Sequence, residues 1–168
     1  MFESAMLGHK IDKETFKAEV PKLRAGLLEA QEKLREDGTF PVIILISGVD
    51  GSGKGDTINT LYEWMDPRYM STRTFSAPTQ EERQRPSMWR FWRALPKKGR
   101  IGIAAGSWYS WPVADRIAGD LSRSDFDQRM DELNRFEEML VNEGALVLKF
   151  WFHLTKDAQR KRLKALET

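Results

Sequence analysis

The residues whose types and spacing best suit chemistry lie between positions 41 and 58. A short β-branched run at 42–46 is typical of a buried strand, and sequence compatible with a helix resumes at Asp56. Between them stand Gly48, Gly51, Gly53 and Gly55. Glycines let the backbone turn sharply and approach a ligand, so that its N–H groups can surround an anion. The spacing from Gly48 to Lys54 is that of a P-loop, in which the lysine neutralises a phosphate.

The predicted phosphate-binding loop includes polar residues as well as glycines. A glycine-rich turn with a solvated lysine is the alternative, but the strand before the loop and the helix after it favour a P-loop. Gly55 follows the lysine, where an ordinary P-loop has Ser or Thr to hold Mg²⁺. Asp50, inside the loop, is therefore the candidate metal ligand. The full predicted set is Gly48, Gly51, Ser52, Gly53, Lys54, Gly55, Asp56 and Thr57.

The composition favours one soluble globular domain. The chain has 168 residues, of which 40% are hydrophobic and 31% charged, a balance that supports a core and argues against disorder. Cysteine is absent, which excludes disulfides and thiolate chemistry, and the two histidines, His9 and His153, do not suggest a histidine metal site. No apolar run reaches membrane-spanning length and no signal pattern opens the chain, so we expect a cytoplasmic protein with no membrane partner.

Positive charge is concentrated between residues 81 and 100. The whole chain carries a net charge of only +2, whereas this stretch holds seven basic and two acidic residues. A local excess of positive charge points to an anionic ligand at one place. A nucleic-acid partner is not expected, because the stretch is local and no nucleic-acid-binding module is recognisable. Trp89, Phe91 and Trp92 lie among the arginines, and either stack on a base or form the apolar face of an amphipathic helix.

Helical and strand patterns alternate along the chain. Apolar residues at helical spacing predict a helix over 13–36, in which Pro21 either kinks the helix or opens a second one, and Gly38 ends it. A long helix is expected to begin at Ser124, which stands in capping-box spacing with Asp127. This alternation predicts an α/β sandwich with a mostly parallel sheet and right-handed crossovers. The other expected elements are strands at 42–46, 69–76, 100–104 and 145–152, a helix from 56 to 65, a helix within 81–95 with Pro86 in its first turn, and a last helix capped by Thr155.

Several motifs in the same order resemble those of the polyphosphate kinase 2 family, P-loop enzymes that move phosphoryl groups between inorganic polyphosphate and nucleotides. The loop from Gly48 to Ile58 is similar to the family's Gly-x-Asp-x-x-Gly-Lys-Gly-x-Thr-Ile. The likeness runs from about residue 13 to residue 166. Further matching segments are Asp66-Pro67-Arg68, Ala77-Pro78-Thr79 with Glu82, Arg90-Phe91-Trp92, Leu95-Pro96 with Gly99, Ser107-Trp108-Tyr109 and Lys149-Phe150-Trp151-Phe152-His153.

The resemblance implies a three-layer α/β/α P-loop kinase fold and an enzyme that transfers phosphoryl from polyphosphate to AMP with Mg²⁺, giving ADP. Residues 1–168 would form one domain, the N-terminal half of a fused two-domain protein, whose partner is the other half or a second copy in a homo-oligomer. By the same resemblance Asp50 and Lys54 are catalytic, with Asp50 holding the metal or orienting the acceptor phosphate. Contacts with polyphosphate or nucleotide are assigned to Arg68, Glu82, Arg83, Arg90, Arg93 and Arg116.

The main departure from the family lies at the end of the third strand. Where the family has Asp-Arg before Ser-Trp-Tyr, this chain has Ala105 and Gly106, and Ser110 and Trp111 replace the Asn and Arg that follow. The missing aspartate is the family's Walker B carboxylate, which supports the metal ion near the transferred group. The family's lid, with its arginine, would begin at or beyond residue 168. This half is therefore expected to be catalytically degenerate.

Two other functions remain open. One is a non-catalytic module that binds polyphosphate or forms a dimer and so supports an active partner domain. The other is an ATP-dependent nucleoside-monophosphate kinase, which shares the fold. Such a kinase would carry Ser or Thr after Lys54 and an aspartate at the end of the third strand, and this chain has neither.

Overall fold

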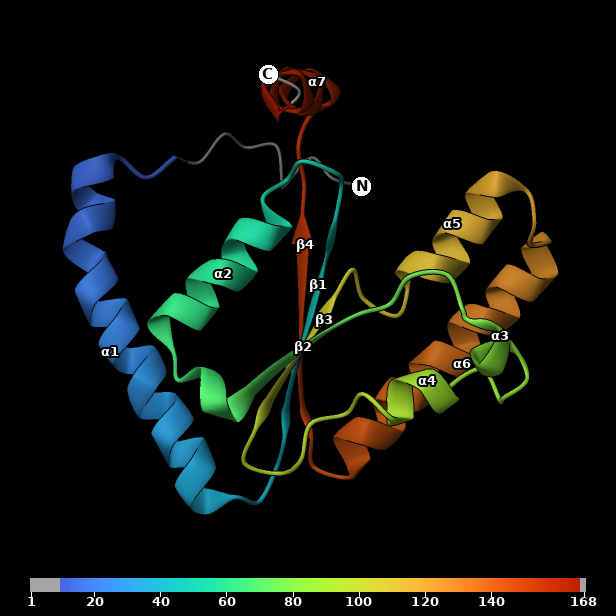
Figure 1. Ribbon diagram of the computed structural model, residues 1–168, viewed down its shortest axis with the longest axis horizontal. Helices are drawn as coiled ribbons and strands as arrows, with labels where there is room; N and C mark the ends of the chain where they lie inside the picture. The colour runs from blue at the N-terminus through green and yellow to red at the C-terminus, as the bar shows by residue number, and fades with distance from the viewer. Residues whose placement is uncertain (1–9, 167–168) are drawn as a thin grey trace.

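Four parallel strands form the central sheet of the computed structural model, which describes residues 10–166 (Figure 1). Their order across the sheet is β2, β3, β1, β4, so β1 and β3 are paired on both sides. All four predicted strands are confirmed to within two residues at each end. The strands span Val42–Gly48 (β1), Met70–Thr74 (β2), Ile101–Ala105 (β3) and Leu146–Phe152 (β4).

Helices cover both faces of the sheet. In Figure 1, α1 and α2 lie on one side and α3 to α6 on the other, while α7 lies beyond the carboxyl ends of the strands. The predicted three-layer α/β/α architecture is thereby confirmed. None of the described helices is both long enough and apolar enough to cross a membrane. Their bounds are Lys13–Asp37 (α1), Lys54–Trp64 (α2), Gln80–Arg83 (α3), Trp89–Trp92 (α4), Ser110–Ala118 (α5), Arg123–Asn142 (α6) and Lys156–Leu166 (α7), with a 3₁₀ turn, η2, at Pro67–Tyr69.

Strand β1 is buried on both faces. Ile43 and Leu45 belong to the core on the side of α4 and α6, where Leu133 is completely buried. Ile44 and Ile46 belong to the core on the side of α1 and α2. This arrangement explains the uninterrupted apolar run at 42–46, because a strand buried on both faces has no solvent side that needs polar residues. The two cores hold the strand that leads into the glycine-rich loop.

Helix α1 is continuous through Pro21, which excludes the prediction that Pro21 opens a second helix. The helix begins at Lys13, well before Pro21. The carboxylate of Asp12 caps it by accepting hydrogen bonds from the N–H groups of Glu14 and Thr15 at 3.0 and 2.8 Å. Gly38 ends the helix as predicted, with φ of 60° and its N–H donating to the carbonyl of Leu34. The positions of the two caps therefore define a single helix.

The helix predicted within 81–95 is confirmed only in part: α4 follows Pro86, but a second short helix, α3, precedes it. A capping box between Thr79 and Glu82 starts α3, which ends at Arg83. Pro86 lies between α3 and α4 rather than in a first turn, and its carbonyl accepts the N–H of Trp89. Since proline has no N–H to donate, it cannot continue the hydrogen-bonding of α3.

Helix α6 begins after Ser122, so the prediction of Ser124 as its cap is wrong. The Oγ of Ser122 accepts a hydrogen bond from the N–H of Asp125 at 3.1 Å. Both serines stand three residues before an aspartate, so the spacing alone does not distinguish them.

Helix α5 was not predicted, although Gly119, which ends it with φ of 87°, was a stop signal in the sequence. Residues 1–9, with His9, and residues 167–168 of the expected domain lie outside the described residues.

Candidate phosphate-binding site

The loop between β1 and α2 has the backbone form that a P-loop requires. Gly51 and Gly53 have φ of 74° and 93°, values that other residues rarely adopt. Gly48, with φ of 139°, stands where β1 meets β4, and a Cβ there would lie 2.1 Å from the carbonyl oxygen of Phe152. That carbonyl also accepts the N–H of Val49 at 3.1 Å. The glycines thus allow both the turn and the close approach of the neighbouring strand.

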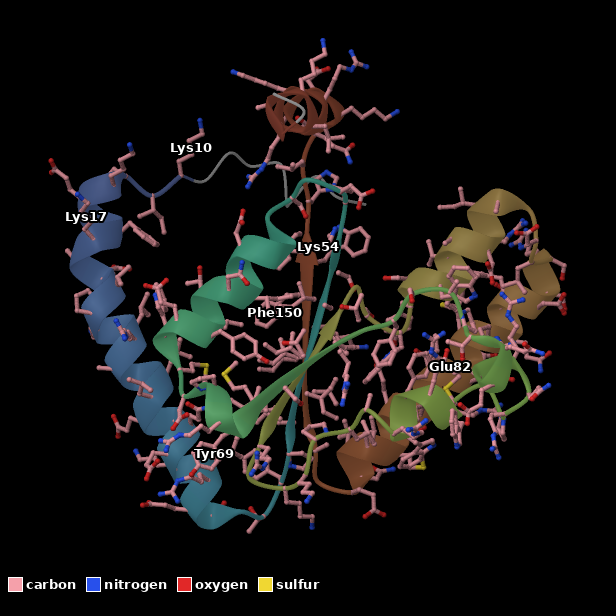
Figure 2. The ribbon with its side chains drawn as sticks, viewed as in Figure 1. Lys10, Lys17, Lys54, Tyr69, Glu82 and Phe150 are labelled. Atoms are coloured by element: carbon pink, nitrogen blue, oxygen red, sulfur yellow. The ribbon has the colours of Figure 1, made fainter. Side chains whose placement is uncertain are left out.

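Lys54 is folded back on the loop. Its Nζ donates to the carbonyl oxygens of Gly48 and Val49, at 2.8 Å each, and lies 3.7 Å from the carboxylate of Asp50. The Lys54 side chain is 23% exposed, whereas that of Asp50 is 92% exposed. Figure 2 shows Lys54 at the carboxyl end of the sheet. The two predicted catalytic residues are therefore brought together at the mouth of the loop.

The two hydroxyl groups of the predicted loop have different environments. Thr57 Oγ1 donates to the carbonyl of Gly53 at 3.1 Å, within the first turn of α2. Ser52 Oγ is buried and has no hydrogen-bond partner among the described residues. A buried hydroxyl without a partner is costly, and a bound anion would supply one. Ser52 is therefore the better placed of the two to contact a phosphate.

The end of β3 lies beside the loop. Ala105 is paired with Ile46 in the sheet, and the N–H of Gly106 donates to the carbonyl of Ile46 at 2.9 Å. Because side chains alternate along a strand, Ala105 shares the face of Ile101 and Ile103, which belong to the core beneath α2. A carboxylate at position 105 would therefore point toward the side of the sheet on which α2 begins. In this chain the position holds only a methyl group.

A polar cluster holds the segment that follows β3. Trp108 Nε1 donates to the buried carboxylate of Glu137 at 3.0 Å. Lys149 of β4 forms a hydrogen-bonded ion pair with the same carboxylate. Burial raises the pKa of the Tyr109 hydroxyl, and a hydrogen bond to Glu137 adds to the effect. Burial lowers the pKa of Lys149, but the hydrogen bond to Glu137, the charge of Glu137 and the contacts with Tyr109 together outweigh burial, so the pKa is raised. Glu137 belongs to a helix that is otherwise apolar on this face, and no sequence motif indicated this role.

Replacing Glu137 with Ala is expected to lower the free energy of unfolding by about 2 kcal/mol, because the Trp108 N–H would stay buried without an acceptor. Lys149 is half exposed and can regain water, which limits the loss. The measurement is urea denaturation. Glu138→Ala removes the exposed neighbouring carboxylate of the same helix and is expected to change stability by about 0.5 kcal/mol or less. Equal effects of the two substitutions would contradict the structural role of Glu137.

A cavity of about 460 Å³, lined by both charged and apolar side chains, lies between α3, α4, α5 and α6. Three of the predicted contact residues, Glu82, Arg83 and Arg90, line it. Arg90 is 9% exposed, donates from Nη2 to the carbonyl of Ser76 at 2.9 Å, and has Nε 3.5 Å from the Glu82 carboxylate. Trp111 also lines the cavity. Cations beside an aromatic ring suit a ligand that joins an anionic group to a flat base.

The remaining aromatic and basic residues of this region have structural contacts. Phe91 is buried in the core, as the apolar-face interpretation predicted. Arg93 lies over the ring of Trp89, with its guanidinium carbon 4.7 Å from the ring centroid. Arg116 donates to the carbonyl of Leu121 at 3.2 Å, at the turn between α5 and α6. Neither arginine contacts the P-loop in the described structure.

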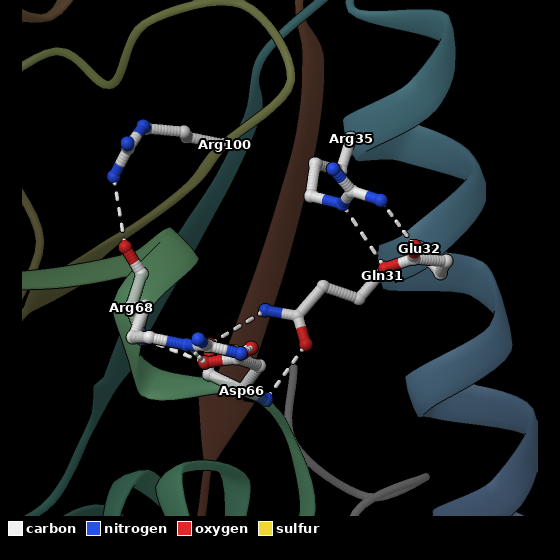
Figure 3. Close-up of polar contacts among 6 residues, drawn as sticks. All are labelled: Gln31, Glu32, Arg35, Asp66, Arg68 and Arg100. Atoms are coloured by element: carbon white, nitrogen blue, oxygen red, sulfur yellow. Dashed lines mark hydrogen bonds and ion pairs between the residues drawn. The ribbon is translucent and has the colours of Figure 1, made fainter.

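Arg68 lies at the other end of the sheet from the P-loop. It precedes β2, and its guanidinium pairs with the carboxylate of Asp66 at 2.6 Å (Figure 3). Gln31 of α1 donates to the carbonyl of Asp66 at 2.9 Å and accepts its N–H at 2.7 Å. Arg100 donates to the Arg68 carbonyl. The structure therefore places Arg68 in a network that joins α1 to the start of β2, away from the loop.

Helix α7 lies against the P-loop, an arrangement that no local sequence pattern predicted. Gln159 Nε2 donates to the carbonyl of Asp50 at 3.0 Å, and Arg162 Nη2 lies 3.1 Å from the carboxylate of Asp56. The partners are more than 100 residues apart in the chain. Only the return of β4 beside β1 brings them together.

The described residues offer a metal ion few ligands. Within residues 10–166, no group of three or more His, Cys, Asp or Glu side chains is placed to bind one. Asp50 supplies one exposed carboxylate at the loop. Mg²⁺ is commonly held by one or two carboxylates together with substrate phosphates and water. The single carboxylate therefore suits a metal ion that takes its other ligands from water or from a bound anion.

Comparison with known families decides the classification. The family model described as polyphosphate kinase 2 matches residues 10–168. The chain belongs to the polyphosphate kinase 2 family. Members of this family are generally metal-dependent phosphotransferases.

Members of the polyphosphate kinase 2 family match nearly the whole chain. The polyphosphate:AMP phosphotransferase of Pseudomonas aeruginosa is 53% identical over 99% of this chain and 34% of that protein. A polyphosphate kinase 2 crystal structure from Pseudomonas aeruginosa PA01 has a TM-score of 0.93 at 52% identity, covering 97% of this chain and 35% of that one. One from Arthrobacter aurescens TC1 has a TM-score of 0.89 at 29% identity, covering 96% and 59%. The chain spans about a third of the length of the Pseudomonas relatives, which agrees with the prediction of a segment of a fused protein.

Proposed function

We propose that the protein to which this chain belongs transfers the terminal phosphoryl group of inorganic polyphosphate to AMP, giving ADP. The observation that carries the proposal is the P-loop, in which Lys54 and Asp50 meet above a helix N-terminus. The name of the Pseudomonas aeruginosa relative, polyphosphate:AMP phosphotransferase, supports the choice of donor and acceptor. We also propose a cytoplasmic location.

In this proposal the loop binds and orients the phosphate chain. Lys54 Nζ exchanges the carbonyls of Gly48 and Val49 for phosphate oxygens, and the Ser52 hydroxyl and the loop N–H groups complete the contacts. Asp50 would hold Mg²⁺, which would supply positive charge to the phosphate oxygens. Because phosphoryl transfer depends mainly on positioning and electrostatic stabilisation, these contacts are the loop's contribution to the reaction.

The proposed site for AMP or for the remainder of the polyphosphate chain is the cavity between α3 and α6. Arg83 and Arg90 supply positive charge there, and Glu82 orients Arg90. Arg93 lines a neighbouring hollow with Glu82 and Arg90, so it stays a candidate contact. Arg68 and Arg116 are supported by sequence alone, since Arg68 pairs with Asp66, Arg116 donates to the carbonyl of Leu121, and neither lines the cavity.

The second candidate function is polyphosphate binding without turnover, in support of an active partner domain or a second copy. Ala105 favours it, because the strand position beside the loop lacks a carboxylate to share the metal ion. We retain the proposal that residues 1–168 form one domain of a longer protein. An ATP-dependent nucleoside-monophosphate kinase is not favoured, because Gly55 stands where such a kinase has Ser or Thr and Ala105 stands where it has aspartate.

Calorimetric titration of the chain with tripolyphosphate, beside an assay of ADP formation from AMP, Mg²⁺ and long-chain polyphosphate, tests the proposal. Lys54→Ala is expected to weaken tripolyphosphate binding by about 30-fold, because a charge-assisted contact is lost. Lys22→Ala removes an exposed charge on α1 and is the control, with a change of about twofold or less.

The outcomes separate the two candidate functions. ADP formation that disappears in Lys54→Ala supports catalysis by this chain. Binding that falls in Lys54→Ala, without ADP formation, supports the non-catalytic function. Binding that Lys54→Ala leaves unchanged contradicts a phosphate site at this loop, and with it both candidates.

A further inference from the structure

We propose that Arg162 of α7 is a second cation of the phosphate site and contacts the same phosphate chain as Lys54. The inference rests on the proposed function of the P-loop and adds to it a residue from a distant part of the chain. No motif singled out Arg162, and its position follows only from the packing of α7 on the loop.

Three side chains on one face of α7 meet the loop. Gln159, Arg162 and Leu163 are spaced three and four residues apart, so they lie on the same helix face. Gln159 donates to the carbonyl of Asp50 at 3.0 Å. A Cβ on Gly51 would lie 3.4 Å from the Leu163 side chain. Figure 1 shows α7 next to the turn between β1 and α2, at the carboxyl end of the sheet.

The Arg162 guanidinium lies at the start of α2. Its Nη2 would be 3.6 Å from a Cβ on Gly53, the residue that caps α2, and is 3.1 Å from the Asp56 carboxylate in the first turn. The guanidinium is therefore beside the N–H groups that a P-loop offers to phosphate. Its planar guanidinium has five N–H donors and can bind two oxygens of a phosphate at once.

The ion pair between Arg162 and Asp56 can be exchanged at little cost. Both side chains are exposed, at 47% and 79%, and exposed ion pairs contribute little to stability. A phosphate oxygen could therefore replace the carboxylate as the partner of Arg162. Helix α7 would keep its place, because Gln159 and Leu163 still contact the loop. The end of β4 also stays attached to the loop, since the carbonyl of Phe152 accepts the N–H of Val49.

The side-chain charges at the loop also favour a second cation. Apart from Arg162, the loop and the first turn of α2 hold one lysine and two carboxylates, Asp50 and Asp56. That local charge is negative, which opposes the approach of a polyanion. Arg162 brings the local charge to zero, and the partial positive charge at the start of α2 then favours anion binding.

Calorimetric titration of the full chain with tripolyphosphate tests this inference. Arg162→Ala is expected to weaken binding by about tenfold, while Arg162→Lys, which keeps the charge but not the planar fork, recovers part of the loss. Arg160→Ala is the matched control: it removes an exposed arginine from the same helix, and no described contact joins Arg160 to the loop. It is expected to change binding by about twofold or less.

Asp56→Asn distinguishes a binding role from a structural one. If Asp56 only helps to hold α7 in place, its loss weakens binding. If Asp56 competes with phosphate for Arg162, binding becomes stronger by about threefold, and the gain disappears in the Arg162→Ala background. The midpoint of thermal unfolding of Arg162→Ala should stay near that of the unmodified chain, since the exposed pair contributes little.

The results separate this inference from the proposed function. If Lys54→Ala weakens binding but Arg162→Ala behaves like Arg160→Ala, the P-loop binds phosphate without Arg162 and the inference is overturned. If Lys54→Ala has no effect, the phosphate site itself is contradicted. A loss of binding in Arg162→Ala with a large fall in the unfolding midpoint, and no gain in Asp56→Asn, would show that Arg162 only supports α7.

Discussion

Gly48→Ala is expected to lower the free energy of unfolding by about 3 kcal/mol or more, since it combines backbone strain with overpacking. The new Cβ would lie 2.1 Å from the carbonyl oxygen and 2.7 Å from the nitrogen of Phe152. These are backbone atoms of a paired strand, so they cannot move aside as a flexible side chain would. The φ of 139° is also unfavourable for alanine. Urea denaturation measures the effect.

Gly55→Ala is the matched control for Gly48→Ala. It makes the same substitution seven residues later, inside α2, where a Cβ would meet no atom within 4 Å. Because alanine favours a helix more than glycine does, the change is expected to be neutral or stabilising by up to about 1 kcal/mol. If Gly48→Ala proved as stable as Gly55→Ala, the close approach of β4 to the loop would be contradicted.

Ala105→Asp is expected to raise Mg²⁺-dependent ADP formation from polyphosphate and AMP by about tenfold or more, because a second carboxylate would help to hold the metal ion at the phosphates. Ala105 is paired with Ile46, two residues before Gly48, and lies on the sheet face that α2 covers. The new carboxylate would therefore lie near Asp50 and the start of α2. The assay compares initial rates over a range of Mg²⁺ concentrations.

Ala105→Asn is the control for Ala105→Asp, because it adds a side chain of similar size without the charge. We expect it to leave ADP formation at the level of the unmodified chain and to show no added dependence on Mg²⁺. Equal rates for the two variants would mean that a carboxylate at position 105 is not what this chain lacks. The missing contribution would then have to come from the partner domain or second copy of the proposed assembly.

The P-loop was predictable because its signals are local. A β-branched run, four glycines and a lysine lie within 18 residues, and each has a direct effect on the backbone. Gly51 and Gly53 indeed have positive φ, and Lys54 opens α2. Gly38 was predicted as a helix end for the same reason. Ser122 was missed because Ser124 has the same spacing to an aspartate, so two local signals competed.

The partners of Glu137 could not be predicted from its own neighbourhood. It occupies an apolar face of α6, and its contacts, Trp108 and Lys149, come from the ends of two other elements. Strand β4 gives a similar case. The strand itself was predicted, but its place was not: the strand order leaves β4 at an edge of the described sheet, where Phe150 and Trp151 are exposed.

Local sequence signals were sufficient to predict the parallel α/β class, the glycine-rich turn and the presence of Lys54 and Asp50 at its mouth. These follow from backbone preferences and from the alternation of strands and helices, which act over a few residues. The contact of Arg162 with Asp56, 106 residues away, arises only when the whole chain is folded. That contact depends on β4 returning next to β1, and the order of strands in a sheet is a property of the whole fold.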